Sequence, residues 1–262
     1  MSRSRSPRPA AVAAYCGHAP REAALNRDAA LNPQADGPNP QAALEQDAAP
    51  DPGTGGPTVA VVEAYAELAR RVLAGPARLG RTRLVAVDGP SGAGKSRFAA
   101  RLAAALAALL GGRPPLLHTD DLLDGWDDQV TFWPRLEEGV LAPLRNGEPG
   151  VYRRYSWVRK CFLPWPVPVP AAPVLVVEGV SAARAVVRPE LTLAVFVTAP
   201  ASLRLARAVA RDGPEILPEL RRWHEGERAH FAADETVTHA HLVVDGAPTL
   251  PHDADRYYTR IR

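Results

Sequence analysis

The sequence predicts an α/β fold in which a parallel β-sheet carries helices on both of its faces. Short runs of β-branched and leucine residues recur along the chain, and longer stretches with helical periodicity separate them. Strands this apolar are buried on both faces, which is typical of parallel strands joined by crossover helices. The expected strands are residues 84–87, 116–117, 174–177, 193–197 and 242–244.

Helices are expected before, between and after these strands. The first helix would be capped by Thr58 and would end before Gly75. Its apolar face consists of Val61, Tyr65, Leu68 and Val72. The next three helices are expected over residues 97–110, 129–145 and 202–211. Trp223, Glu227 and Phe231 recur at every fourth position, which predicts a further helix that packs back onto the sheet.

Residues 1–57 differ from the rest of the chain in composition. They contain nine prolines and fourteen alanines but only six larger apolar side chains. Such a segment buries too little surface to offset the entropy of ordering it, and it shows neither the apolar core of a secretory signal nor the amphipathic period of a transit peptide. We therefore expect a disordered low-complexity arm over residues 1–57 and one folded domain over residues 58–262.

The charge balance and the cysteine content exclude several classes of protein. The chain carries 31 basic and 29 acidic residues, and its net charge of +2 gives no electrostatic reason to expect binding to nucleic acid or to an anionic membrane. Two cysteines are too few for a disulfide framework or a four-thiolate zinc site. No apolar run approaches the roughly 20 residues of a transmembrane helix. We expect a cytoplasmic protein, either monomeric or a homo-oligomer.

A phosphate-binding motif lies between the first expected strand of the sheet and the helix that follows it. Residues 89–96, Gly-Pro-Ser-Gly-Ala-Gly-Lys-Ser, fit the Walker A pattern G-x-x-x-x-G-K-[ST] at every fixed position. Glycines let the backbone fold so tightly that successive N–H groups converge on phosphate oxygens, and the helix N-terminus adds its positive dipole. The residues expected to bind the nucleotide are Gly89, Pro90, Ser91, Gly92, Ala93, Gly94, Lys95 and Ser96.

Two side chains of this motif have distinct chemistry. Lys95 brings a compact ammonium to the terminal phosphates, and the Ser96 hydroxyl is expected to ligate magnesium. Only two of the 31 basic residues are lysines, Lys95 and Lys160. One of the two thus lies in the motif, at the position where a compact point charge suits the site. ATP and Mg²⁺ are therefore the expected cofactors. The expected fold is a three-layer P-loop NTPase fold with a parallel five-stranded sheet flanked by helices.

Acidic residues follow two of the other expected strands. Asp120 and Asp121 come after the second strand, and Glu178 comes at the end of the third. The carboxyl ends of parallel strands border the ligand crevice, so either aspartate could accept a proton from an attacking hydroxyl, and Glu178 could hold magnesium. The alternative for each acid is that it caps the segment that follows.

Arginines and aromatic residues form two further candidate groups. Arg204, Arg207 and Arg211 are spaced to share one helix face and to contact phosphoryl oxygens, with a solvated stripe as the alternative. Residues 152–157, Tyr-Arg-Arg-Tyr-Ser-Trp, precede a proline–valine alternation at 164–170, which predicts an irregular hairpin. This hairpin either clamps a substrate or covers a sheet edge. Its residues expected to contact a substrate are Tyr152, Arg154 and Tyr155.

Together these residues resemble the uridine kinase family of P-loop phosphotransferases, whose relatives include phosphoribulokinase and bacterial pantothenate kinase. The resemblance covers roughly residues 84–246 and rests on the Walker A motif, Asp120, the 152–157 segment, Val-Glu-Gly at 177–179 and the arginine-rich run at 204–212. It implies that Asp120 is the general base on a 5′-hydroxyl and that Glu178 helps to hold magnesium. It also implies that the three arginines act from a lid helix.

Two features depart from the pattern of that family. Leu122 and Leu123 stand where family members carry an aromatic pair, and no histidine occurs between Tyr152 and Pro170, where uridine kinases recognise the base. The expected function is transfer of the ATP γ-phosphate to a hydroxyl of a small metabolite, with a nucleoside as first choice. The alternatives are a non-nucleoside acceptor, such as a pantothenate-like or sugar alcohol, and a nucleotide-binding regulatory protein without an acceptor.

Overall fold

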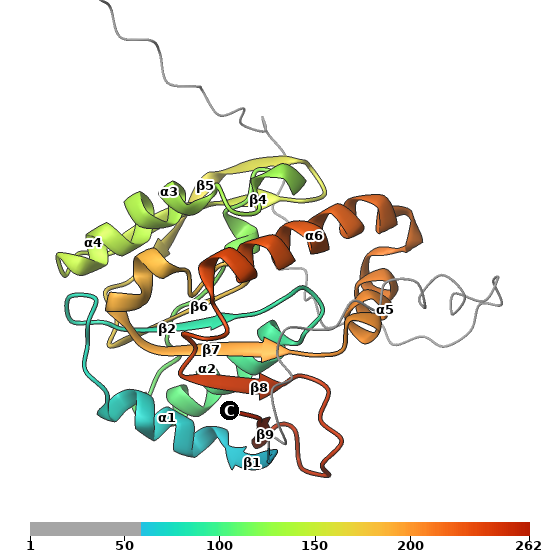
Figure 1. The fold of residues 1–262 in the computed structure, drawn as a ribbon. Helices are drawn as coiled ribbons and strands as arrows, with labels where there is room; N and C mark the ends of the chain where they lie inside the picture. The colour runs from blue at the N-terminus through green and yellow to red at the C-terminus, as the bar shows by residue number, and fades with distance from the viewer. Residues whose placement is uncertain (1–58) are drawn as a thin grey trace, which may run out of the picture.

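The computed structural model describes residues 59–262 and shows a twisted sheet with helices on both faces (Figure 1). The strands of this sheet are β1 (Val61–Ala64), β2 (Arg83–Asp88), β3 (Leu116–His118), β6 (Val174–Glu178), β7 (Leu191–Thr198), β8 (Leu242–Asp245) and β9 (Tyr257–Arg260). Their order is β1-β9-β8-β7-β2-β6-β3. The predicted arm at residues 1–57 and the predicted cap at Thr58 lie outside the described residues.

The five strands from β8 to β3 are the predicted parallel sheet. β8, β7, β2, β6 and β3 pair in parallel, and each contains the residues expected for it. The α/β fold class and the five-stranded parallel core are therefore confirmed. Two antiparallel strands, β9 and β1, extend the sheet beyond β8 and were not predicted.

The first helix begins later than its periodicity indicated. Residues Val61–Ala64 form β1 and pair with β9, and helix α1 spans only Tyr65–Ala74 before Gly75. The prediction that Val61 lies on the buried helix face is wrong, because this residue belongs to an exposed edge strand. Its partner strand comes from the opposite end of the chain, so local spacing could not reveal the pairing.

The helices cover the two faces of the sheet and its carboxyl end. α1 and α2 (Lys95–Leu110) pack on one face, and α6 (Leu217–Asp234) lies over the other (Figure 1). The predicted packing of this last helix onto the sheet is confirmed by the contact of Phe231 with Phe196 in β7, with ring centroids 5.2 Å apart. α5 (Ala201–Asp212) follows β7 at the carboxyl end of the strands. Within residues 59–262, no helix is both long enough and apolar enough to cross a membrane.

Residues 129–145 form the predicted helix only from Trp133 onwards, and its geometry is not α-helical throughout. They contain α3 (Trp133–Leu136), a π-helical turn (Glu137–Leu141) and α4 (Ala142–Arg145). Pro143 has no N–H to donate to the carbonyl of Gly139, which breaks a regular α-helical ladder. Gly139 also lies so close to the neighbouring strand that a Cβ there would be 2.6 Å from the Val151 carbonyl oxygen. The helix is therefore interrupted where it packs against the hairpin.

The predicted hairpin is confirmed as a separate two-stranded sheet. β4 (Gly150–Ser156) and β5 (Cys161–Val169) pair antiparallel, with a register shift between Arg153 and Tyr155. The prolines of β5 are tolerated because a two-stranded ribbon leaves one edge of each strand without a partner. The hairpin lies on the α6 side of the main sheet (Figure 1).

Candidate active site

A cavity of about 1110 Å³ lies at the carboxyl ends of the parallel strands. It brings together the phosphate-binding loop at residues 89–96, the ends of β3 and β6, and one side of α5. The lining includes Lys95, Ser96, Asp120, Glu178, Arg207 and Arg211. These six predicted residues come from four separate segments of the sequence and share one site, which is where open α/β sheets place their ligands.

The phosphate-binding loop depends on glycines at three positions. Gly89, Gly92 and Gly94 have φ angles of 133°, 77° and 104°. A Cβ on Gly89 would lie 2.1 Å from the Val197 carbonyl oxygen, so the loop also needs the missing side chain for space. The side chain of Lys95 is buried, and its ammonium donates a hydrogen bond to the carbonyl of the loop residue at position 90, at 3.0 Å. The loop is therefore compact, with its one cation folded over it.

Replacing Gly92 with alanine is expected to cost more stability than the same change at Gly111. Both glycines have positive φ, but a Cβ at Gly111 meets nothing within 4 Å, whereas at Gly92 it would lie 2.4 Å from the Arg204 carbonyl oxygen. G111A should cost about 1 kcal/mol of unfolding free energy through backbone strain, and G92A about 3 kcal/mol or more because a clash is added. Urea unfolding measures both. Equal losses would contradict the tight contact between loop and α5.

Glu178, the last residue of β6, connects the phosphate-binding loop to the end of β3. Its carboxylate is buried, accepts a hydrogen bond from Ser96 Oγ at 3.0 Å and contacts His118 Nδ1. Burial raises the pKa of this carboxyl, but His118, Lys95 and Ser96 together hold the pKa below its ordinary value. The hydrogen bond to Glu178 in turn raises the pKa of His118. A histidine at the end of β3 thus belongs to the site, although the sequence analysis did not identify it.

The oxygens of Ser96 and Glu178 fit a magnesium ion. Both are hard donors, and magnesium usually keeps several waters and takes one or two protein ligands together with substrate phosphates. Among residues 59–262 there is no group of three or more His, Cys, Asp or Glu side chains that could hold a metal by itself. The donors therefore fit an ion that is bound jointly with phosphate.

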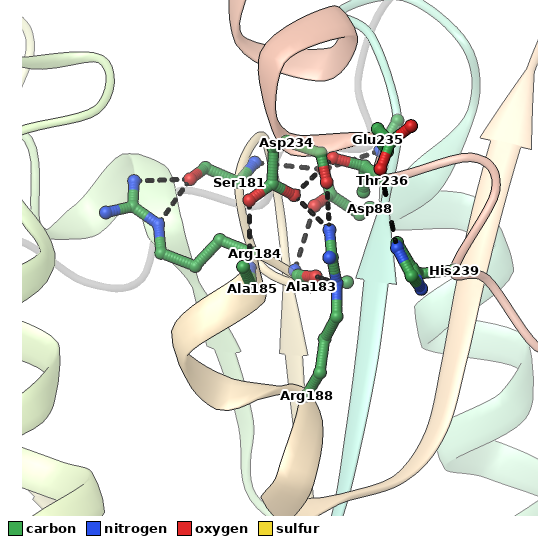
Figure 2. Close-up of polar contacts among 11 residues, drawn as sticks. Asp88, Ser181, Ala183, Arg184, Ala185, Arg188, Asp234, Glu235, Thr236 and His239 are labelled. Atoms are coloured by element: carbon green, nitrogen blue, oxygen red, sulfur yellow. Dashed lines mark hydrogen bonds and ion pairs between the residues drawn. The ribbon is translucent and has the colours of Figure 1, made fainter.

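Asp88 ends β2 immediately before the loop, and it too was missed in the sequence. Its fully buried carboxylate accepts hydrogen bonds from the backbone N–H groups of Gly89 at 2.7 Å, Ser181 at 2.9 Å and Ala183 at 2.8 Å (Figure 2). Burial raises the pKa of Asp88 to about 6, against these hydrogen bonds and the charge of Lys95, which lower it. Asp88 ties the start of the loop to the segment after β6.

The same polar network reaches the end of α6. Asp234, the last residue of that helix, accepts a hydrogen bond from the N–H of Ala185 at 2.9 Å and pairs with Arg188 (Figure 2). Arg184 donates to Ser181 Oγ at 2.7 Å from the same segment. The segment after β6 therefore connects the phosphate-binding loop with the C-terminus of α6.

The raised pKa of Asp88 predicts a pH-dependent contribution to stability. A carboxyl whose pKa rises from 3.8 to about 6 on folding binds more protons in the folded state, so the unfolding free energy falls as the pH increases between these values. The unaltered chain should lose about 3 kcal/mol from this group between about pH 4 and pH 7, and the D88N variant should not. Urea unfolding across that range tests this. Parallel pH profiles for the two chains would contradict the raised pKa.

Asp120 and Asp121 form a short turn directly after β3, and both line the cavity. Asp121 is buried, and its carboxylate lies 3.2 Å from Arg154 Nε and accepts a hydrogen bond from Tyr152 Oη at 3.4 Å. Asp120 is less buried, and its carbonyl oxygen accepts a hydrogen bond from Trp157 Nε1 at 3.1 Å. The hairpin therefore positions both aspartates in the cavity wall, through the side chain of Asp121 and the backbone of Asp120.

The hairpin residues predicted to contact a substrate have different surroundings. Arg154 lines the cavity, whereas Tyr152 is partly buried against the core and bonds to Asp121. Tyr155 is buried and packs edge to face on Trp157 and Phe162, with ring centroids 5.4 and 5.3 Å apart. Tyr155 therefore completes the packing of the hairpin and does not line the cavity, and its contact with a substrate stays a prediction.

Two of the three predicted arginines of α5 line the cavity. Arg207 donates hydrogen bonds to the carbonyl oxygens of Gly92 and Gly246, both at 3.1 Å. Arg211 pairs with Asp212, whose hydrogen bonds raise the pKa of this guanidinium, and the charge of Asp120 raises it further. Arg211 therefore lies within electrostatic reach of Asp120, which lines the same cavity.

Arg204 does not share that position. Its guanidinium is buried, donates to the Ala199 carbonyl oxygen at 3.0 Å and lies outside the cavity lining. The predicted contact of Arg204 with phosphate stays a prediction, but in this structure its guanidinium lies apart from the other two. The physical reason is the buried carboxylate of Glu227, which lies 4.0 Å from Arg204 Nη1 and favours the guanidinium in the interior.

Comparisons with known proteins agree with this architecture. No protein-family model and no curated protein matches the chain. Among solved structures, a possible uridine kinase from Bacillus stearothermophilus is 18% identical, with a TM-score of 0.51 over 68% of this chain and 96% of that one. A candidate fructose transport system kinase from Silicibacter sp. TM1040 is 22% identical, with a TM-score of 0.43 over 67% and 91%. The first of these likenesses shows that the chain has the fold of a uridine kinase-like P-loop kinase.

Proposed function

We propose that this protein is an ATP- and magnesium-dependent kinase that phosphorylates a hydroxyl group of a small metabolite. The observation that carries the proposal is the composition of one cavity. A phosphate-binding loop with Lys95, a hard-oxygen pair at Ser96 and Glu178, and Asp120 at the end of β3 all line it. Binding of a nucleotide alone requires neither an aspartate at that position nor further arginines, whereas transfer to an acceptor uses both.

Each group has a defined task in such a transfer. The carboxylate of Asp120 accepts the proton of the acceptor hydroxyl as its oxygen bonds to the γ-phosphorus, and ADP departs with the bridging oxygen. Lys95, Arg207 and Arg211 place positive charge around the transferring group, where negative charge is spread over the phosphoryl oxygens. Magnesium bound with the nucleotide at Ser96 and Glu178 would neutralise phosphate charge. Most of the rate enhancement then comes from positioning and electrostatics.

The acceptor we favour is a nucleoside, and a pantothenate-like or sugar alcohol is the alternative. The nucleoside rests on the resemblance and on the fold. The alternative rests on Leu122 and Leu123, which are buried in the core and stand where members of the resembling family carry an aromatic pair. The polar wall made by Asp121 and Arg154 suits a hydroxylated acceptor of either kind.

The remaining assignments follow from this proposal. Residues 58–262 would be the kinase domain, and the protein would act in the cytoplasm on ATP and a small molecule, as a monomer or a homo-oligomer. A regulatory protein that binds ATP without an acceptor is the competing function, and it is distinguished by the absence of acceptor-dependent turnover.

The proposal is tested by the release of ADP from MgATP in the presence of a panel of nucleosides, ribosides, sugar alcohols and pantothenate. We expect one chemical group of the panel to stimulate ADP release well above the acceptor-free rate. Stimulation by nucleosides would support the first acceptor class, and stimulation by other alcohols alone would support the second. ATP binding without stimulation by any compound would favour the regulatory protein.

A further inference from the structure

Glu227, in the middle of α6, holds the phosphate-binding loop from the helix side. Its side chain is buried, with 1% of its surface exposed. One carboxylate oxygen accepts hydrogen bonds from the backbone N–H of Ser91 at 2.8 Å, from the Ser91 hydroxyl at 2.5 Å and from Trp223 Nε1 at 2.8 Å. Two of these three donors belong to the loop, so a residue of α6 determines where Ser91 lies.

The second carboxylate oxygen of Glu227 is unusual. It is buried and accepts no hydrogen bond within residues 59–262. The nearest cation is Arg204 Nη1 on α5, 4.0 Å away, beyond hydrogen-bonding distance. A buried carboxylate with one oxygen left without a donor costs folding free energy. An apolar side chain would pack α6 against its neighbours equally well. We therefore attribute the presence of a carboxylate here to the three hydrogen bonds that its first oxygen accepts.

The loop is also held on its other side by α5. The Gly92 carbonyl oxygen accepts a hydrogen bond from Arg207 at 3.1 Å, and the backbone of Gly92 lies directly against that of Arg204. α6 therefore binds the N–H and hydroxyl of residue 91, while α5 binds the carbonyl of residue 92. The two helices thus hold two consecutive residues of the loop, which restricts the peptide units on either side of the one that joins Ser91 to Gly92.

We propose that Glu227 is a positioning residue of the phosphate-binding loop, acting through Ser91 to hold the loop in the conformation that receives nucleotide phosphates. The inference rests on the proposed function only in requiring that the loop binds magnesium nucleotide. It extends the nucleotide site to α6, a helix that contributes no residue to the predicted set. A preformed loop binds tighter because the cost of ordering it has already been met in the folded protein.

The test is the affinity of the full chain for MgADP, measured by titration calorimetry, in four variants. E227Q keeps the size of the side chain and removes the charge, and E225Q makes the same change at an exposed position on the same helix. S91A removes the hydroxyl donor, and the double variant E227Q/S91A tests coupling. We expect E227Q to weaken MgADP binding about tenfold, which corresponds to one charge-assisted hydrogen bond, and E225Q to stay within about twofold.

Coupling separates positioning from a merely structural role. If Glu227 acts through Ser91, E227Q/S91A should weaken MgADP binding by less than the product of the two single losses, because both changes act on the hydrogen bond between the Ser91 hydroxyl and the carboxylate. A general loosening of α6 predicts that the two losses multiply. Circular dichroism establishes that each variant is folded. If E227Q is unfolded, E227D, which keeps the charge but shortens the reach to Ser91, takes its place with the same expected loss.

Each of the remaining outcomes would contradict either the role of Glu227, the kinase function, or both. MgADP binding by folded E227Q at the affinity of the unaltered chain, or multiplied losses in the double variant, overturns the role of Glu227 alone. Failure of every acceptor in the ADP-release panel overturns the kinase but leaves this result standing. Absence of MgADP binding by the unaltered chain overturns both.

Discussion

Replacement of Asp120 with asparagine is expected to slow phosphoryl transfer by orders of magnitude while leaving the affinity for MgATP nearly unchanged. The amide keeps the shape of the side chain but cannot accept a proton from the acceptor hydroxyl. General base catalysis contributes on the order of 10²- to 10⁴-fold to such reactions, so kcat should fall by that factor. The phosphate-binding loop lies on another strand, so titration with MgATP should give the affinity of the unaltered chain.

The matched control is the same change at the neighbouring aspartate. Asp121 is held by Arg154 and Tyr152, so D121N should disturb the wall of the hairpin and weaken acceptor binding more than it slows transfer. Steady-state kinetics with the best acceptor of the panel separates the two effects as kcat and KM. Full turnover by D120N would remove Asp120 as the base, and loss of kcat in D121N alone would assign that role to Asp121.

Replacement of Lys95 with methionine is expected to remove both nucleotide binding and activity. The ammonium is the only lysine charge in the cavity, and it is poised over the loop at 3.0 Å from a loop carbonyl. Methionine matches the length of the stem but carries no charge, so the terminal phosphates lose their main partner. Charge-assisted contacts of this kind contribute roughly 1.5–3 kcal/mol each, and we expect MgATP affinity to fall at least tenfold.

The second lysine of the chain supplies the control. Lys160 is exposed in the turn between β4 and β5, away from the cavity lining. K160M removes the same charge from the same protein and should leave affinity and turnover within about twofold. If K95M bound MgATP as tightly as the unaltered chain, residues 89–96 would not be the phosphate site, whatever their match to the motif.

The parallel core could be predicted because each of its strands carries its own signal. β2 and β6 are buried along nearly their whole length, and their apolar runs can be recognised without knowing their neighbours. β1 and β9 carry no such signal. Each is short and partly exposed, and each depends on partners that are distant in the sequence: β1 pairs with β9, and β9 lies between β1 and β8. Pairing between the two ends of a chain is a tertiary effect that local periodicity does not contain.

The residues of the candidate site likewise fall into those that the sequence could predict and those that it could not. Residues at strand ends, such as Asp120 and Glu178, could be located because the topology of a parallel sheet brings those ends together. The surroundings of Arg204 could not be anticipated, because they depend on Glu227, a residue of another helix. A signal for Glu227 was present: an acid on the face that Trp223 and Phe231 place toward the sheet must be buried, and a buried acid needs donors.

Whether this protein is a small-molecule kinase is tested most directly by following the phosphorus atom itself. The chain is incubated with magnesium and ATP labelled at the γ-phosphorus, together with the acceptor that most stimulates ADP release. We predict that the label appears in the acceptor as a phosphate ester, in amounts equal to the ADP formed, and that D120N forms it on the order of 10²- to 10⁴-fold more slowly. Label found only in inorganic phosphate, or ATP left intact with every acceptor, would contradict the assignment of this protein as a small-molecule kinase.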